Sequence, residues 1–307
     1  MKRSSIGLLG FGYVLGISCL SFGCDDPIER AQDITRSRVL AARSEASQEP
    51  SRATPRPGEA VSVRWLVASP DPQPRIGAGF SACMGADWNS GTGDCLEAPF
   101  ALANRSEVEG SELEFTFELP ETWDAVAHPR IHLEGTFCAG SEATESGACT
   151  GGQTGLRAVF DLNLETPEFT NQNPAFEEPA ILLDGAPWLA APEPFDCGSA
   201  LVPQLAADAT IHELEIRIDA GSREPVSPVL AEDPTRESIL VSHFASAGSL
   251  DRPFSRLSWS EENTGVRVPW SAPATVEAPG TRAHFWIVLR DERGGTAYIE
   301  RSVCLIP

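Results

Sequence analysis

Apolar and polar residues alternate with a period of two in many short segments of the chain. In the clearest segment, Leu113, Phe115, Phe117 and Leu119 alternate with three glutamates and a threonine. Successive side chains of a strand point to opposite faces, so this pattern predicts a strand with one buried face. Other segments with this alternation, or with a compact apolar run, lie at 61–67, 131–137, 156–164, 214–218, 239–244 and 284–290.

Turn-forming residues separate these segments. Pro, Gly, Asp or Asn bound most of them, and Asp-Glu-Arg-Gly-Gly at 291–295 precedes a last segment at 296–305. This arrangement predicts a C-terminal hairpin. The body of the sequence has no amphipathic helical pattern longer than two turns. Many short strands between regular turns favour an all-β fold of antiparallel sandwiches over βαβ units.

A break in this rhythm divides the chain. Residues 166–179 contain several prolines and asparagines and show little periodicity, which is typical of a domain boundary. We therefore expect two tandem sandwiches, at 36–165 and 166–307. Residues 24–35 are mostly polar and lack aromatic side chains, so we expect a tether there, with one or two helical turns as the alternative.

The N-terminus has the layout of a signal peptide. Lys2 and Arg3 precede an almost uncharged apolar run from Ile6 to Phe22, as in segments that direct export. The segment 20–24, Leu-Ser-Phe-Gly-Cys, resembles a lipobox, the motif whose cysteine becomes the acylated first residue of a bacterial lipoprotein. The resemblance implies a signal peptide at 1–23 and an anchor of fatty-acyl groups such as palmitate on Cys24.

Three alternatives to this assignment remain. A rival box ends at Cys19, but it would leave Cys24 as an unpaired thiol in an oxidising compartment. The apolar segment could stay uncleaved, since 6–23 is at the short limit for a membrane span, or the protein could be secreted without a lipid. With the basic head inside, either form of anchor places everything after Asp25 on the outer side of the membrane.

Six cysteines follow Cys24, and an even number in an exported protein predicts disulfides. Two pairs flank short loops with glycines that can close without strain, which leaves the last two cysteines to join each other. Zinc is the alternative, but the chain has no C-x-x-C pair and no histidine at ligand spacing from a cysteine, so we expect no metal. The predicted pairs are Cys83–Cys95, Cys138–Cys149 and Cys197–Cys304.

Composition narrows the classes of partner. With 41% hydrophobic and 22% charged residues, the chain is typical of globular rather than disordered proteins. The formal net charge of −21 would repel nucleic acid and anionic lipid headgroups, so neither is expected to bind. We interpret the negative surface mainly as a source of solubility.

The chain contains no strong catalytic motif. Gly-Phe-Ser-Ala-Cys at 79–83 resembles a nucleophile elbow, but it lacks the second glycine and a following helix, so we interpret it as a strand that enters a disulfide. Only His128 and His132 lie close together among five histidines, while His212 and His243 are expected in the core. Acidic pairs at 25–26, 177–178 and 291–292 lack EF-hand spacing, and the last pair is expected to start a hairpin turn.

Trp88 is the candidate contact residue. It lies in the Gly-rich loop between Cys83 and Cys95, whereas the other tryptophans lie in or beside predicted strands. An exposed tryptophan offers a large contact area for a partner.

Two stretches resemble immunoglobulin-like modules of bacterial surface lipoproteins. These are 57–65, Pro-Gly-Glu-Ala-Val-Ser-Val-Arg-Trp, and 285–295, Phe-Trp-Ile-Val-Leu-Arg-Asp-Glu-Arg-Gly-Gly. Most of 36–307 fits the rhythm of strands, but these stretches carry nearly all the specificity. The resemblance implies that Trp65 packs on the first core, whereas the comparable strand of the second body offers His243. It brings no activity with it.

Together these observations predict a non-enzymatic lipoprotein of the bacterial envelope that binds or spaces something at the cell surface. No cofactor is expected. The expected partners are a membrane, through the lipid, and an envelope protein or glycan; the expected location is the outer membrane or cell surface rather than the inner membrane. The alternative is a secreted hydrolase or carbohydrate-active enzyme whose acidic pair comes from separate loops.

Overall fold

The computed structural model describes residues 30–70, 75–85, 95–144, 147–152, 154–166, 169–191, 197, 202–225 and 236–307. Residues Ala31–Pro307 form one compact unit, distinct from Met1–Arg30. Within the described ranges the regular structure consists of strands and short 3₁₀ helices such as Thr150–Gly152 and Ala220–Ser222. The prediction of an all-β fold is therefore confirmed. None of these helices is long and apolar enough to span a bilayer.

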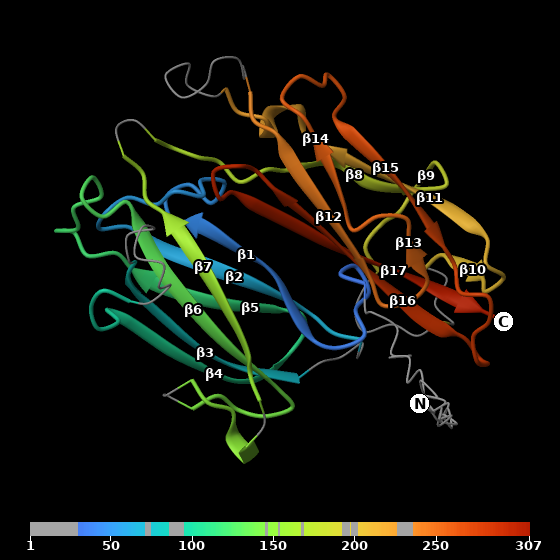
Figure 1. Cartoon of the computed structure of the whole chain (residues 1–307), viewed down its shortest axis with the longest axis horizontal. Coiled ribbons are helices and arrows are strands. Elements are labelled where there is room, and N and C mark those ends of the chain that lie inside the picture. The colour runs from blue at the N-terminus through green and yellow to red at the C-terminus, as the bar shows by residue number, and fades with distance from the viewer. Residues whose placement is uncertain are drawn as a thin grey trace, which may run out of the picture. The chain divides into compact units, whose positions relative to one another are not determined.

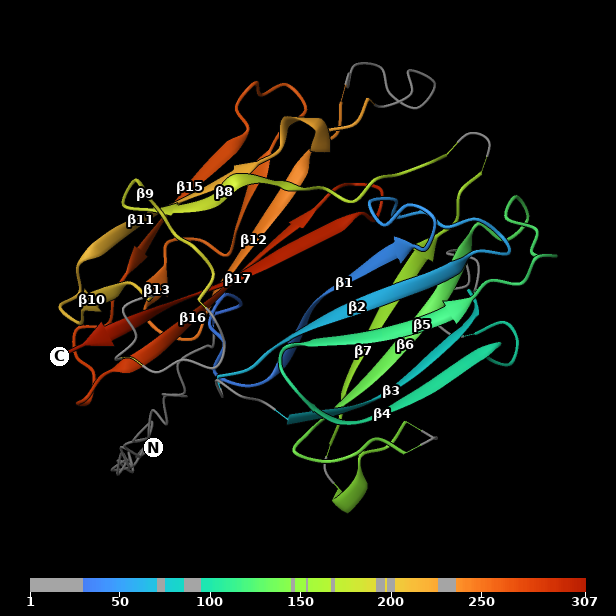
Figure 2. The ribbon, with the colours of Figure 1, turned by 180° about the vertical axis from the view of Figure 1, so that it is seen from behind.

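The first seven strands form two sheets, which we name the N-terminal sheet pair. One has the order β1-β2-β5 and the other β4-β3-β6-β7, and all neighbours are antiparallel. Figures 1 and 2 show the two layers from opposite sides. The strands are β1 (Arg38–Ala46), β2 (Ala60–Ala68), β3 (Arg75–Met84), β4 (Ala101–Glu109), β5 (Glu112–Glu118), β6 (Arg130–Ala139) and β7 (Leu156–Asn163).

Alternate residues of these two sheets meet in one core. Trp65 of β2 is fully buried there, with its ring centroid 5.5 Å from that of Phe137 on the opposite sheet. Phe80 stacks at 5.3 Å on Phe115. The period-two pattern in the sequence is therefore the inner face of each sheet, and Trp65 packs on the core as the resemblance implies.

The remaining strands form the C-terminal sheet pair. Its sheets have the orders β10-β17-β16-β12-β14 and β13-β15-β11-β8-β9; neighbours are antiparallel except for β10 and β17. Their common core includes Trp188, Trp270 and Phe285, and the predicted hairpin is the β16–β17 pair. The strands are β8 (Phe176–Leu183), β9 (Ala186–Pro187), β10 (Gln204–Ala206), β11 (Ile211–Ile218), β12 (Ile239–Ala245), β13 (Ser249–Leu250), β14 (Phe254–Leu257), β15 (Gly265–Ser271), β16 (Thr281–Arg290) and β17 (Thr296–Ile306).

The irregular segment between the pairs is shorter than the sequence predicts. We expected it to reach Pro179, but β8 begins at Phe176 and includes this proline. Pairing of β8 with β11 jumps from Ile181 to Phe176. Proline has no backbone N–H to donate, and it is tolerated at such an interruption of the ladder.

A third apolar cluster, the joint cluster, brings the two pairs together. It contains Leu40 and Leu66 from β1 and β2 with Trp286 and Val288 from β16. Ile34 lies in it as well, although it belongs to the stretch expected to be a tether. Its backbone N–H donates to the carbonyl of Ala245 (2.9 Å), and the Ala245 N–H donates to the carbonyl of Gln32 (3.0 Å).

The connecting segment is bonded to both pairs. Asn171 is buried; its carbonyl accepts from the N–H of Ala53 (2.9 Å), and its own N–H donates to the Thr54 hydroxyl (3.0 Å). Asn173 donates to the carbonyl of Ser44 (2.7 Å) and accepts from the N–H of Thr296 (2.9 Å). Because hydrogen bonds between buried groups resist separation, Asn171 and Asn173 hold this part of the connection against both sheet pairs.

Three disulfides complete the fold. Cys83 is joined to Cys95 and Cys138 to Cys149, across 12 and 11 residues, and Cys197 is joined to Cys304 across 107 residues. These are the pairs that the spacing of the cysteines predicts.

Candidate functional site

The outer face of the β4-β3-β6-β7 sheet is hollow along its second strand. β3 turns alternate residues into the core and leaves Gly77, Gly79 and Ser81 on the outer face. Two of these residues have no side chain and the third has a short one. The surface over β3 is therefore lower than the surface over a neighbouring strand that has longer outward side chains.

The neighbouring strands supply those longer side chains. The register places Leu102 of β4 and Glu134 of β6 on either side of Ser81, while Asn104 and Thr136 flank the glycine one step away on the same face. The result is a groove of about 660 Å³, which we call the β3 groove. Its size is in the range of small-ligand sites.

A disulfide-tied loop closes one end of the β3 groove. The segment after β6 folds back over β3 and is fixed by the Cys138–Cys149 bond. A Cβ added at Gly77 would lie 2.4 Å from the carbonyl oxygen of Ser141 and 2.8 Å from the Cα of Glu142. Glycine is thus required at 77 by the close approach of two backbones.

The groove offers mainly neutral hydrogen-bonding groups. Glu134 is its one lining carboxylate among the described residues, and it accepts a hydrogen bond from Arg157 at 2.7 Å. The hydroxyls of Ser81 and Thr136 remain beside the apolar side chain of Leu102, which is 67% exposed. A ligand that fits here would exchange hydrogen bonds with short side chains and cover Leu102.

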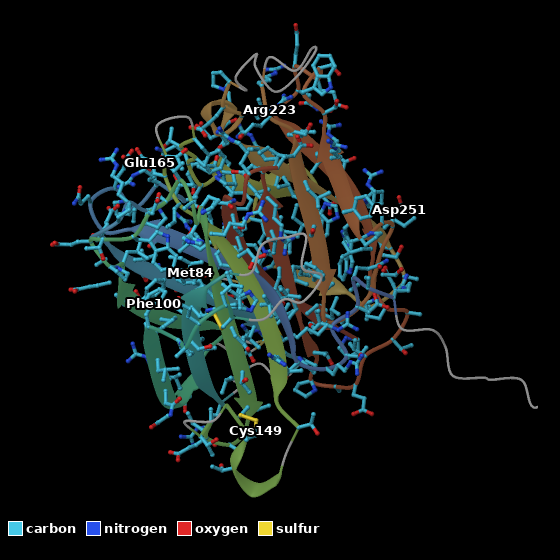
Figure 3. All side chains as sticks on the ribbon, turned by 60° about the vertical axis from the view of Figure 1, so that its left-hand side comes forward. Met84, Phe100, Cys149, Glu165, Arg223 and Asp251 are labelled. Atoms are coloured by element: carbon cyan, nitrogen blue, oxygen red, sulfur yellow. A yellow bond between two sulfur atoms is a disulfide. The ribbon has the colours of Figure 1, made fainter. Side chains whose placement is uncertain are left out.

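A second cavity of about 350 Å³ lies at the end of β3, and we call it the end pocket. Met84, Phe100 and Trp123 line it with half-buried apolar side chains, and the rings of Phe100 and Trp123 meet edge to face at 5.5 Å. Figure 3 shows Met84 and Phe100 beside each other, with Cys149 and its disulfide at the far end of the same strands.

Two carboxylates, Glu97 and Asp124, also line the end pocket. One Asp124 oxygen accepts from the backbone N–H groups of Val126 and Ala127, both at 3.0 Å, which fixes the side chain in a turn. The Trp123 indole N–H donates to the carbonyl of His128 at 2.8 Å. Both the aromatic ring and the acid beside it are therefore held in place without a ligand.

One loop separates the groove from the end pocket. Pro99 lines the groove, whereas Glu97 and Phe100 line the pocket. The loop is fixed by the Cys83–Cys95 bond and by hydrogen bonds from Leu96 N to Met84 O and from Phe100 N to Ala82 O, both 3.0 Å. The two cavities are thus adjacent parts of one rigid surface.

The histidines expected in the core are there. His243 is fully buried, and its burial lowers its pKa to about 4. His212 bonds to Asp184 at 2.7 Å; burial would raise the pKa of this acid, but the bonds from His212 and the Glu213 N–H lower it. His284 is half-buried, and desolvation, followed by the charge of Arg282, lowers its pKa to about 3. At neutral pH these shifts keep His243 and His284 uncharged.

Asp291 starts the hairpin turn as predicted. Its side chain accepts from the backbone N–H groups of Arg293 (2.7 Å) and Gly295 (2.8 Å). The nearby Glu237 is 1% exposed and pairs with Arg293. Burial, and then the charges of Asp291 and Glu224, raise the pKa of Glu237 to about 7 against the opposite effect of Arg293.

Only some of the predicted site residues lie within the part of the chain that the structure describes. The lipidation site Cys24 and the contact residue Trp88 lie outside the described residues, while the six other cysteines form the three disulfides. In the described ranges, no three His, Cys, Asp or Glu side chains gather as a metal site.

Sequence reasoning missed the groove and the end pocket. The available signal was the run of small residues at every second position of β3, Gly77, Gly79 and Ser81, between apolar residues that face the core. Such a run predicts a strand with a low outer face, but it does not identify the flanking strands.

No family model matches the sequence, and no curated protein sequence matches it significantly. Among solved structures, the chain is similar to a red sea bream transglutaminase (12% identity, TM-score 0.28, 89% of this chain and 32% of that one). It is also similar to dimeric latent PorU from Porphyromonas gingivalis (12%, 0.22, 88% and 24%) and to Spo0M, a sporulation control protein of Bacillus subtilis (10%, 0.26, 88% and 91%). The chain spans about a third and a quarter of the first two. All three TM-scores are low, and none carries a functional argument.

Proposed function

We propose that this protein is a non-enzymatic lipoprotein of the bacterial envelope, anchored through Cys24, whose two tandem immunoglobulin-like sandwiches present the β3 groove to a partner. The signal-peptide pattern and the three disulfides support an oxidising location outside the cytoplasm. The proposed partner is an envelope protein or glycan, and the net charge of −21 disfavours nucleic acid.

The groove is the observation that carries the binding role. Its low floor comes from Gly79 and Ser81, and the loops at its two ends are each tied by a disulfide. A site with fixed walls loses little conformational entropy when a ligand binds. Groups such as Thr136 can satisfy the hydrogen bonds of a polar partner, while Leu102 gives it an apolar contact.

Photocrosslinking in intact envelopes tests this role. A photoreactive phenylalanine analogue is placed at Leu102 in the groove or at Ile211 on β11, which are 67% and 68% exposed. We expect a discrete crosslinked species from position 102 and none from 211. Equal capture at both positions, or no capture at 102, would contradict the proposed role of the groove.

The anchor has its own test. Cys24→Ser removes the acylation site, and a diacyl chain contributes about 0.8 kcal/mol per buried methylene to membrane binding. We expect the variant to move from the detergent phase to the aqueous phase in phase partitioning. A variant that stays uncleaved and membrane-bound would favour the uncleaved anchor instead.

A hydrolase remains the second candidate, because the end pocket brings Glu97 and Asp124 together from separate loops. Glycosidases use two carboxylates about 5–10 Å apart across the scissile bond. Release of reducing sugars from envelope glycans, lost in both Glu97→Gln and Asp124→Asn, would support this candidate over the binding module.

A further inference from the structure

The end pocket is lined by the carboxylates of Glu97 and Asp124 and by the imidazole of His128. None of the described residues that line it is lysine or arginine, and Glu97 and Asp124 form no ion pair within the described ranges. By contrast, the carboxylate of the groove, Glu134, is paired with Arg157. The two adjacent cavities thus differ in charge.

We propose that the end pocket binds the side chain of a lysine or arginine that projects from a protein partner lying in the β3 groove. Such a side chain has an aliphatic stem and a charged tip. The stem would pack on Met84, Phe100 and Trp123, and the tip would reach the two carboxylates. A cation beside an aromatic ring gains further attraction from the ring face.

Charge complementarity favours this occupant over a neutral sugar. A sugar could stack on Trp123, but its binding would cover Glu97 and Asp124 without supplying a compensating charge, which carries a desolvation cost. A basic side chain supplies that charge through charge-assisted hydrogen bonds. The net charge of −21 also attracts cationic partners over a distance.

The position of the pocket suits one residue of an extended segment. Among the described residues, the loop that contains Glu97 and Pro99 lies between this pocket and the groove. A segment that follows β3 along the groove could therefore extend one side chain past this loop. This inference rests on the proposed binding function and adds the chemistry of the partner.

Titration of the full mature chain tests the inference directly. The probes are Nα-acetyl-lysine amide, Nα-acetyl-arginine amide, the neutral norleucine amide and N-acetylglucosamine. The readout is the indole N–H resonance of Trp123, identified among the seven tryptophans by its loss in Trp123→Phe. We expect saturable shifts with the two basic probes and at least about tenfold weaker binding of norleucine amide.

Variants separate charge from shape. Glu97→Gln with Asp124→Asn keeps the size of both side chains and should weaken lysine amide binding about tenfold. The control Glu215→Gln, on the C-terminal sheet pair and outside both cavities, should leave it unchanged. Raising the salt concentration should weaken binding as well. Equal binding of norleucine amide, preference for the sugar, hydrolysis of a probe, or no saturable binding would each overturn the inference.

These outcomes are distinct from those of the crosslinking experiment. If position 102 captures a partner but the pocket shows no preference for basic probes, the proposed function of the groove stands. The proposal that the pocket binds a basic side chain is then contradicted. If the basic probes bind but position 102 captures no partner, the proposed function of the groove is contradicted. The proposal of an extended partner segment that occupies both cavities is then contradicted as well.

Discussion

Each sheet pair has sheets with one face in the core and one face outside it. The outer face of the sheet that contains β3 differs from the outer face of the sheet that contains β11. On β3 of the N-terminal pair the outer residues are Gly77, Gly79 and Ser81. On β11 of the C-terminal pair the corresponding outward residues include Glu213, Glu215 and Arg217, which form ion pairs with neighbouring strands. The first face is hollow and the second is covered by long charged side chains.

The two faces differ because the outward side chains of β3 are short and those of β11 are long and charged. Both strands send alternate apolar residues into a core, so their inner faces are alike. Their outer residues do not pack in these cores, and they differ between the two strands, with Gly77 further restricted by the loop that lies over it. On the N-terminal pair the short outer side chains leave the β3 groove, and on the C-terminal pair the long charged side chains form a solvated surface.

Buried glutamates make a second contrast between the pairs. Glu59 of the N-terminal pair is 3% exposed, and burial alone would raise its pKa. Hydrogen bonds from the N–H groups of Arg56 and Gln48 and from the Arg52 guanidinium outweigh burial and lower the pKa. No backbone N–H of the described residues donates to the Glu237 side chain in the C-terminal pair, and the pKa of Glu237 rises to about 7.

The largest expected effect separates the disulfides of the two pairs. The bond between Cys197 and Cys304 closes a loop of 107 residues, for which the chain-entropy model predicts about 4.7 kcal/mol of stabilisation, compared with about 3 kcal/mol for short loops. The Cys197→Ala, Cys304→Ala variant should therefore unfold at a lower denaturant concentration than the Cys138→Ala, Cys149→Ala variant. Equal denaturation midpoints would contradict this order.

A change in pH should affect the two glutamates in opposite directions. The unfolded pKa of Glu237 is 4.5 and the folded pKa about 7, so the stabilisation from its proton is complete below pH 4.5 and lost as pH rises to 7. The loss is about 3 kcal/mol, which Glu237→Gln should abolish. Glu59 has a lowered folded pKa, so its stabilisation exists above pH 4.5 and is lost on acidification.

Denaturant unfolding between about pH 2 and pH 8 measures both effects, because the contribution of Glu59 is lost below pH 4.5. Glu59→Gln should destabilise the protein at pH 7 and flatten the acid side of the stability curve. If Glu237→Gln leaves the slope between pH 4.5 and 7 unchanged, Glu237 is not the group that titrates there.

A single methyl group should disturb the hollow face. Gly77→Ala places a Cβ 2.4 Å from the Ser141 carbonyl oxygen, so the loop tied by Cys138–Cys149 must move, at a cost of about 1–3 kcal/mol. Gly85→Ala is the matched control, since its nearest contact would be 3.4 Å away. Thermal unfolding should show a loss for the first variant and little change for the control.

The smallest effect is expected on the covered face. Arg267 pairs with Glu215 at 3.0 Å on the surface of the C-terminal pair, and exposed ion pairs contribute about 0.2–1 kcal/mol. Glu215→Ala should therefore lower the free energy of unfolding by less than about 1 kcal/mol and leave crosslinking at Leu102 unchanged. A larger loss would show that this face is more than a solvated surface.

Much of the fold was predictable where burial is strongly periodic. Phe115 and Phe117 of β5 face the core with exposed glutamates between them, so the alternation is plain in the sequence. The disulfides were predictable because short loops limit the possible partners. β4 gave no such signal: its core-facing residues are small, Ala101 and Ala103, while the large apolar Leu102 is exposed.

The candidate site was less predictable because it depends on register. The groove exists only because Leu102 and Glu134 are placed opposite Ser81 by strands far apart in sequence. No local pattern specifies that pairing. Leu66 illustrates the same limit, since its outward position in β2 predicts exposure but the joint cluster buries it.

The attachment of Ile34 has a mechanical consequence. This residue contacts the joint cluster, and its backbone is paired with Ala245 at the end of β12. A pull on the chain before Gln32 is therefore transmitted first to apolar contacts shared by both sheet pairs, not to a terminal strand at an edge. Tension would therefore be divided between the two sheet pairs.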